Sequence, residues 1–161
     1  MTEPGFRRGV RLGIDWGYAR VGVAACDADG LLCYPLETIP ASDQEAALAR
    51  VASLAQQLEP LEIIVGLPLA LDGRVALAAN NVTGVAKQLA SLVKVPIRLV
   101  DERLTTAQAN QQLGHLDTRK RRKVVDQVAA TGILEGSLAT ERHTGNPPGQ
   151  LIECPWTEGN A

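Results

Sequence analysis

Residues 11–26 read RLGIDWGYARVGVAAC, two short apolar runs separated by a glycine-containing turn. Alternation along the first run puts Gly13 and Asp15 on one face of a strand and the apolar residues beside them on the other. A buried carboxylate is costly unless a partner, several hydrogen bonds or a metal offsets its desolvation. Asp15 therefore either faces a cleft at the end of the strand or caps the following turn. Gly13 leaves room for a helix or a substrate to approach the sheet beside Asp15.

The chain after Asp15 alternates between strand and helix patterns. Apolar alternation, with a turn at Asp29-Gly30, predicts three successive strands over residues 10–15, 20–26 and 32–39. A helix is expected to begin at Ser42, with Glu45 as its capping-box partner, and to end before Pro60. Later strands are predicted over residues 62–66 and 96–101. Further helices are predicted with Val82, Val85, Leu89 and Leu92 on one face, over residues 105–114, and over residues 124–138.

This order, βββαβαβα with one extra short helix, predicts an α/β fold. Three antiparallel strands followed by crossovers make a mixed five-stranded sheet with helices on both faces, which is the ribonuclease H-like architecture. With 161 residues, the chain is expected to form one domain over residues 11–142. Residues 1–10 are expected to form a flexible arm, and residues 143–161 an irregular or disordered tail.

The composition excludes several classes of protein. No apolar run is long enough to span a membrane, so no membrane partner is expected. The three cysteines have no metal-binding spacing, which favours a reducing cytoplasm and argues against a structural zinc site. Neither a dinucleotide-binding nor a P-loop motif occurs. The net charge of −2 gives no global signal for nucleic acid, although one local run does.

Two further carboxylates lie in comparably apolar surroundings. Glu102 follows the predicted fifth strand, and Asp126 shares a helical stripe with apolar residues. Each also has an ordinary explanation, because Glu102 can pair with Arg103 and Asp126 with Arg122. If the two converge with Asp15, they suit Mg²⁺ or Mn²⁺, since hard cations prefer carboxylate oxygens and support phosphodiester hydrolysis.

A basic run precedes Asp126. Its cations, with Arg20 and Arg103, are candidate phosphate contacts, and a solvated helix start is the alternative explanation. Cations at a helix amino terminus are disfavoured by the helix dipole, which favours a polyanionic partner. No aromatic residues interleave the run, so a base-stacking platform is not indicated. The run consists of Arg119, Lys120, Arg121, Arg122 and Lys123.

Four motifs, GIDWGYARVGVA, VGLPLALDG, VDERLTT and VDQVAATGIL, occur in this order between residues 11 and 138. In this order and spacing the chain resembles the YqgF (RuvX) family, ribonuclease H-like proteins described as pre-16S rRNA nucleases or Holliday-junction-resolvase-like proteins. The resemblance implies that Asp15, Glu102 and Asp126 are the catalytic, metal-binding acids. It also implies a cytoplasmic metal-dependent nuclease that matures the 5′ end of precursor 16S rRNA in ribosome biogenesis, with ribosomal particles as partners.

Two other functions fit the same residues. A Holliday-junction resolvase would cut branched DNA and would need two active sites, hence a dimer, but the sequence leaves the oligomeric state open. A non-catalytic RNA-binding ribosome-assembly factor would bind RNA without cleaving it. An actin-like ATPase is set aside because such proteins need two domains of this kind, which 161 residues cannot supply.

Overall fold

The computed structural model describes residues 6–67, 73–101 and 118–152, with the backbone alone described for residues 73–80 and 118–127. Its centre is a mixed sheet in the strand order β3-β2-β1-β4-β5-β6. The strands β1, β2 and β3 form an antiparallel meander, whereas β1, β4 and β5 run parallel. The strands are β1 Arg11–Trp16, β2 Arg20–Cys26, β3 Cys33–Pro40, β4 Glu62–Leu67, β5 Ile97–Asp101 and β6 Gln150–Leu151.

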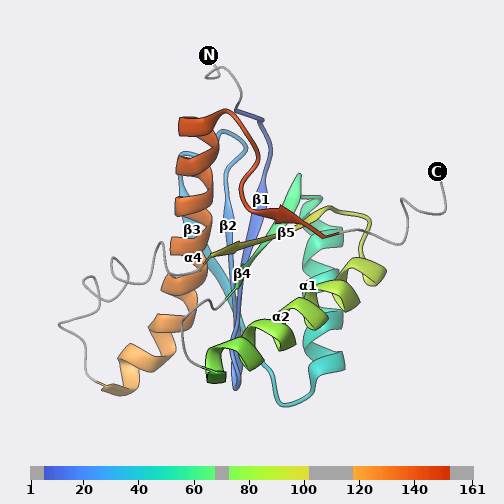
Figure 1. The fold of residues 1–161 in the computed structure, drawn as a ribbon. Helices are drawn as coiled ribbons and strands as arrows, with labels where there is room; N and C mark the ends of the chain where they lie inside the picture. The colour runs from blue at the N-terminus through green and yellow to red at the C-terminus, as the bar shows by residue number, and fades with distance from the viewer. Residues whose placement is uncertain (1–5, 68–72, 102–117, 153–161) are drawn as a thin grey trace.

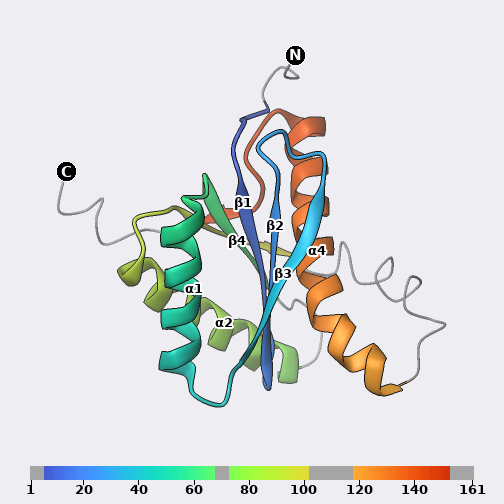
Figure 2. The same ribbon diagram turned by 180° about the vertical axis from the view of Figure 1, so that it is seen from behind.

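Helices cover both faces of this sheet, as the sequence predicts. Helices α1 (Gln44–Leu58) and α2 (Gly73–Leu92) lie on one side, and α4 (Thr118–Thr144) lies on the other (Figures 1 and 2). Alternating residues of β1 divide between the two sides, so that Leu12 and Ile14 belong to the larger core beneath α1 and α2. The smaller core beneath α4 contains Ala24, Ile64, Ala130, Ile133, Leu134 and Leu138. The predicted ribonuclease H-like class is confirmed, with one strand more than predicted.

At Gly13 the backbone of α4 packs directly against β1. A Cβ atom at Gly13 would lie 2.9 Å from the carbonyl oxygen of Ala130 and 3.1 Å from Cβ of Leu134. Only a glycine lets the helix backbone approach this closely, which is what the sequence led us to expect of Gly13. The contact fixes which part of α4 crosses β1.

The first two helices differ from the sequence prediction in detail. Asp43, not Ser42, caps α1, because its extended backbone lets its carboxylate accept a hydrogen bond from the Ala46 amide at 3.1 Å. Leu92, predicted on the buried face of α2, is 53% exposed, whereas the neighbouring Val93 is buried. The predicted short helix over residues 105–114 lies outside the described residues.

Helix α4 and the segment after it are more regular than predicted. The helix was expected over residues 124–138 and spans Thr118–Thr144, so the basic run of residues 119–123 is part of it. Residues 150–151 then add β6 antiparallel to β5, and Ile152 is buried in the larger core. Gly149, at φ +65°, permits this because a Cβ there would lie 2.1 Å from the carbonyl oxygen of Leu99.

The amino-terminal residues 6–10, expected to be loose, are anchored. The ring of Phe6 is buried, with the guanidinium of Arg142 4.2 Å from its centroid and that of Arg11 4.9 Å away. The Gly9 amide donates a hydrogen bond to the Ala28 carbonyl at 2.8 Å. Within the described part of the chain, no helix is both long enough and apolar enough to cross a membrane.

Candidate functional site

The carboxyl ends of β1, β4 and β5 meet at one edge of the sheet because these three strands are parallel. Asp15 is the last but one residue of β1, and Leu67 at the end of β4 pairs with Asp101 at the end of β5. Glu102 follows Asp101 directly in the sequence but lies outside the described residues. In α/β sheets this edge is where ligands bind.

Asp15 lies half-buried on the face of β1 that α4 covers. Gly22 of β2 is its cross-strand partner. On the other side, continuing the register beyond the pair Ile14 and Val65 brings Gly66 of β4 next to Asp15. Together with Gly13, these glycines mean that the nearest positions of the sheet on this face carry no side chains. The carboxylate of Asp15 is therefore flanked in the sheet by glycine backbone and not by other side chains.

The turn after Asp15 is short and tightly constrained. The Gly17 amide donates a hydrogen bond to the Arg20 carbonyl at 2.9 Å, and a Cβ at Gly17 would lie 2.6 Å from the same oxygen. Arg20, a predicted phosphate contact, begins β2 and is half-buried. The turn is thus closed by a main-chain bond, and Asp15 and Arg20 flank it.

Helix α4 runs along the strand face that carries Asp15. Its residue Glu141 contacts Arg11 at the start of β1, and its residue Ala130 contacts Gly13, so the helix and the strand run in opposite directions. Asp126 lies one helical turn before Ala130, in the direction of Asp15. Of the stripe predicted with Asp126, Ala130 and Ile133 are buried, whereas Ala129 is half-buried.

The other predicted site residues fall outside what is described. Arg103 lies in the undescribed segment with Glu102, and no side chain is described for Asp126 or for residues 119–123. Among the described side chains, no three His, Cys, Asp or Glu residues are grouped as a metal site. The convergence of the three acids therefore stays a prediction, of which the structure describes the position of Asp15.

A pocket of about 360 Å³ lies between α4 and the edge formed by β5 and the segment leading into β6. Its floor is largely apolar, and its polar groups include Asp101, Ser137 and Thr140. Sequence reasoning missed it because one wall, Pro148–Gln150, belongs to the predicted irregular tail. The pocket is lined by Leu67, Leu99, Val100, Asp101, Ile133, Gly136, Ser137, Thr140, Pro148, Gly149 and Gln150.

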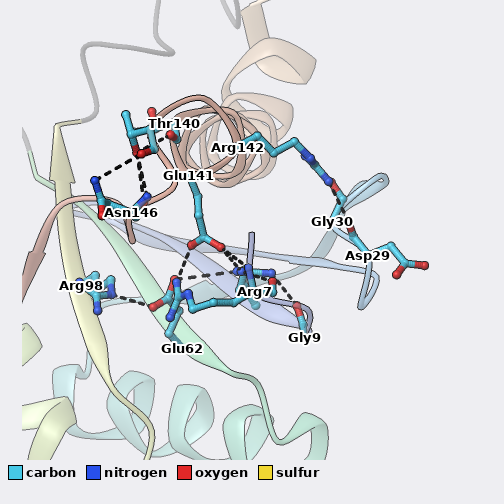
Figure 3. Close-up of polar contacts among 12 residues, drawn as sticks. Arg7, Gly9, Asp29, Gly30, Glu62, Arg98, Thr140, Glu141, Arg142 and Asn146 are labelled. Carbon is cyan, nitrogen blue, oxygen red and sulfur yellow. Dashed lines mark hydrogen bonds and ion pairs between the residues drawn. The ribbon is translucent and has the colours of Figure 1, made fainter. Parts of the chain in front are cut away.

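A second polar cluster occupies the opposite end of β1, beneath the carboxyl-terminal end of α4 (Figure 3). The side chains of Arg11, Glu62 and Glu141 are each only 1% exposed. Glu62 accepts hydrogen bonds from Arg7 at 2.9 Å and from Arg98 at 2.7 Å. Sequence reasoning missed this cluster, although an arginine at the start of an apolar strand was a usable signal.

Glu141 is the acid that ties α4 to this cluster. It accepts hydrogen bonds from the backbone amide and the guanidinium of Arg7 and, at 2.9 Å, from the guanidinium of Arg11. Burial alone would raise the pKa of this carboxyl, but the bonds from Arg7 and the charge of Arg11 outweigh it and hold the pKa below its ordinary value. The carboxylate is therefore ionised at neutral pH.

Comparison with known proteins identifies the family. The RuvX family model, described as Holliday junction resolvase, matches residues 9–140. The chain belongs to the RuvX family. It is 46% identical to a Streptomyces coelicolor protein named "Putative pre-16S rRNA nuclease". The 153 aligned residues cover 93% of this chain and 92% of that relative. A Thermobifida fusca protein of the same name is 46% identical over 157 residues, covering 91% of this chain and 98% of that relative.

A solved structure supports the fold assignment of this RuvX protein. The structure titled "T. thermophilus RuvC in complex with Holliday junction substrate" matches with a TM-score of 0.62, covering 86% of this chain and 99% of that one. Its sequence is only 18% identical, so the likeness concerns the fold alone.

Proposed function

We propose that this RuvX protein is a metal-dependent nuclease that cuts structured RNA and matures the 5′ end of precursor 16S rRNA, acting in the cytoplasm on ribosomal particles. The observation that carries the proposal is the setting of Asp15. It stands at the carboxyl edge of the sheet with glycines at the neighbouring positions of its face, beneath the helix that carries Asp126. The names of the bacterial relatives supply the substrate.

The residues at this edge fit a hard divalent cation. Asp15 offers carboxylate oxygens where the neighbouring sheet positions carry no side chain, and Glu102 directly follows Asp101, the last residue of β5, in the sequence. Asp15, Glu102 and Asp126 would hold Mg²⁺ or Mn²⁺. When bound, such ions lower the pKa of a water molecule and offset charge on the leaving oxygen of a phosphodiester.

The cations of the chain would hold the substrate backbone. Residues 119–123 lie in the first turns of α4, at the same end of the sheet as the turn between β1 and β2 (Figure 1). Arg20 begins β2 directly after that turn, and Arg103 follows Glu102. Phosphate contacts of this kind fix the position of a nucleic acid, and their affinity falls as salt rises.

The decisive experiment compares Asp15→Asn with a matched control, Asp29→Asn, in the turn between β2 and β3. Asp29 is an exposed turn residue whose side chain pairs with Arg8 at 2.8 Å, so its loss leaves the candidate site intact. We expect Asp15→Asn to reduce Mg²⁺-dependent cleavage of a precursor 16S rRNA fragment by about 100-fold or more, with RNA binding and thermal stability retained. Cleavage by Asp15→Asn at the rate of Asp29→Asn would refute the assignment.

A second candidate, cleavage of four-way DNA junctions, is favoured by the description of the family model. The same assay with a four-way junction distinguishes the two, because a resolvase would cut the junction symmetrically and leave the RNA intact. Symmetric cutting also needs two active sites, so light scattering should then detect a dimer on the junction. A non-catalytic assembly factor would bind RNA without cleaving it, and Glu102→Gln or Asp126→Asn would leave that binding unchanged.

A further inference from the structure

Tyr18 is fully exposed at the tip of the turn between β1 and β2, with a relative accessibility of 103%. The other aromatic residues in the described part of the chain are more covered: Phe6 is buried, Trp16 packs partly against the larger core, and Tyr34 is 38% exposed. A tyrosine ring that packs against nothing contributes no burial to folding. Tyr18 is therefore available to an external partner.

The backbone that presents Tyr18 is held on both sides. Before it, the Gly17 amide is bonded to the Arg20 carbonyl, with no room for a Cβ at Gly17. After it, the carbonyl of Ala19 accepts a hydrogen bond from the Ala41 amide at 2.9 Å, which ties the turn to the end of β3. A ring on a constrained turn loses less conformational entropy on binding than one on a free loop.

The position of Tyr18 suggests its partner. It lies three residues after Asp15, the candidate catalytic acid, and two before Arg20, a candidate phosphate contact. Because the turn follows β1 directly after Asp15, a nucleic-acid strand with a phosphate at Asp15 would bring a neighbouring base to this turn. Every base has an aromatic face, and stacking on an exposed ring is worth about 1–3 kcal/mol per base.

We propose that Tyr18 stacks on an unpaired base beside the phosphate that Asp15 addresses, and so positions a single-stranded segment of the substrate. This inference rests on the proposed function, because it takes the substrate to be nucleic acid. Stacking uses the face of the ring and not its hydroxyl group, so phenylalanine and tryptophan should replace tyrosine. A perfectly paired duplex should gain nothing from Tyr18, since its bases are already stacked on one another.

The test uses the full-length chain in Mg²⁺-free buffer, so that binding is measured without cleavage. The probe is a precursor 16S rRNA fragment carrying 2-aminopurine in the unpaired segment at the cleavage site, with a fully paired duplex for comparison. We expect Tyr18→Ala to weaken binding of the unpaired probe about tenfold and to abolish its 2-aminopurine fluorescence change. Tyr18→Phe and Tyr18→Trp should retain both, and Tyr34→Ala, on β3, should bind like the unsubstituted chain.

Two results would overturn the inference: unchanged binding of the unpaired probe by Tyr18→Ala, or an equal loss on the paired duplex. Thermal melting of Tyr18→Ala checks that the turn still folds, which we expect because the ring makes no buried contact. The proposed function fails separately, in the cleavage assay of Asp15→Asn. An RNA-binding protein without nuclease activity would still show the Tyr18 effect.

Discussion

The two ends of the contact between β1 and α4 use charge in opposite ways. At the start of β1, Arg11 is buried against Glu141 of α4. Glu62 and Glu141 there accept hydrogen bonds from arginines of the protein itself (Figure 3). At the other end, the nearest sheet positions on the face of Asp15 are Gly13, Gly22 and Gly66, none of which has a side chain. The first end is closed by ion pairs, whereas at the second end the sheet positions next to Asp15 are glycines.

One helix joins these two ends. Because α4 is held at Glu141 and at Ala130, the path of its remaining turns toward Asp15 is set by contacts made elsewhere. We therefore expect the end at Glu141 to contribute stability and the placement of α4, and the end at Asp15 to carry the proposed chemistry. Substitutions at the two ends should separate these roles, since one set changes the free energy of unfolding and the other changes cleavage.

The largest effect on stability is expected from Glu141→Gln. It leaves Arg7, Arg11 and Arg98 facing the single carboxylate of Glu62. Removing one partner from a buried ion cluster typically costs about 3–5 kcal/mol, so we expect a loss near the lower value, because Arg7 is partly exposed. Urea denaturation measures this loss. A change below about 1 kcal/mol would mean that the cluster does not lock α4 to the sheet.

Gly13→Ala tests the contact between the two ends. Its new methyl group would meet the Ala130 carbonyl, so α4 must shift, at a cost of about 1–3 kcal/mol. We also expect cleavage to fall beyond the loss of folded protein, because Asp126 lies one turn from the displaced residue. Gly84→Ala in α2 is the control: its Cβ would meet nothing within 4 Å, so it should stabilise the protein by about 0.5–1 kcal/mol. If Gly13→Ala cleaves normally per folded molecule, the position of α4 does not determine the cleavage rate, and this prediction is wrong.

Acid should weaken the closed end selectively. The pKa of Glu141 is lower in the folded protein than its ordinary value of 4.5, so its contribution to stability is complete above that value. As pH falls through the range between 4.5 and the lower folded pKa, the unfolded chain binds a proton first and this contribution is lost. The stability difference between the unsubstituted chain and Glu141→Gln should therefore shrink on acidification, measured by denaturation between pH 3 and 7. A pH-independent difference would show that the charge of Glu141 contributes nothing.

The sequence predicted those elements whose structure depends on the pattern of neighbouring residues in the chain. Alternation of side chains gave β1 and β2 within a residue of their observed bounds and put Gly13 on the face that α4 covers. The ion cluster joins Arg11 to Glu141, 130 residues apart, and no local pattern carries that pairing. Likewise, β6 is two residues long and exists because β5 offers it an edge.

The candidate site divides in the same way. Asp15 could be placed from its own strand, because the alternation and the glycine after it were sufficient. The meeting of Asp15 with Glu102 and Asp126 depends on how a strand end and a helix converge, and this remains a prediction. The turn residue Tyr18 was not singled out, since exposure is a property of the folded chain and not of the motif.

The smallest effect on the free energy of unfolding is expected for an arginine–glutamate ion pair that is exposed to solvent. Arg50 of α1 donates two hydrogen bonds of 2.7 Å to the carboxylate of Glu37 on β3, and these bonds hold the pKa of Glu37 below its ordinary value. The hydrogen-bond distances are similar to those of the buried cluster, but the side chains are 42% and 30% exposed. Glu37→Gln should therefore cost less than about 1 kcal/mol in urea denaturation, and less still at high salt. A loss as large as that of Glu141→Gln would show that burial does not distinguish the two pairs, and the contrast between the closed end and the rest of the surface would then have no energetic basis.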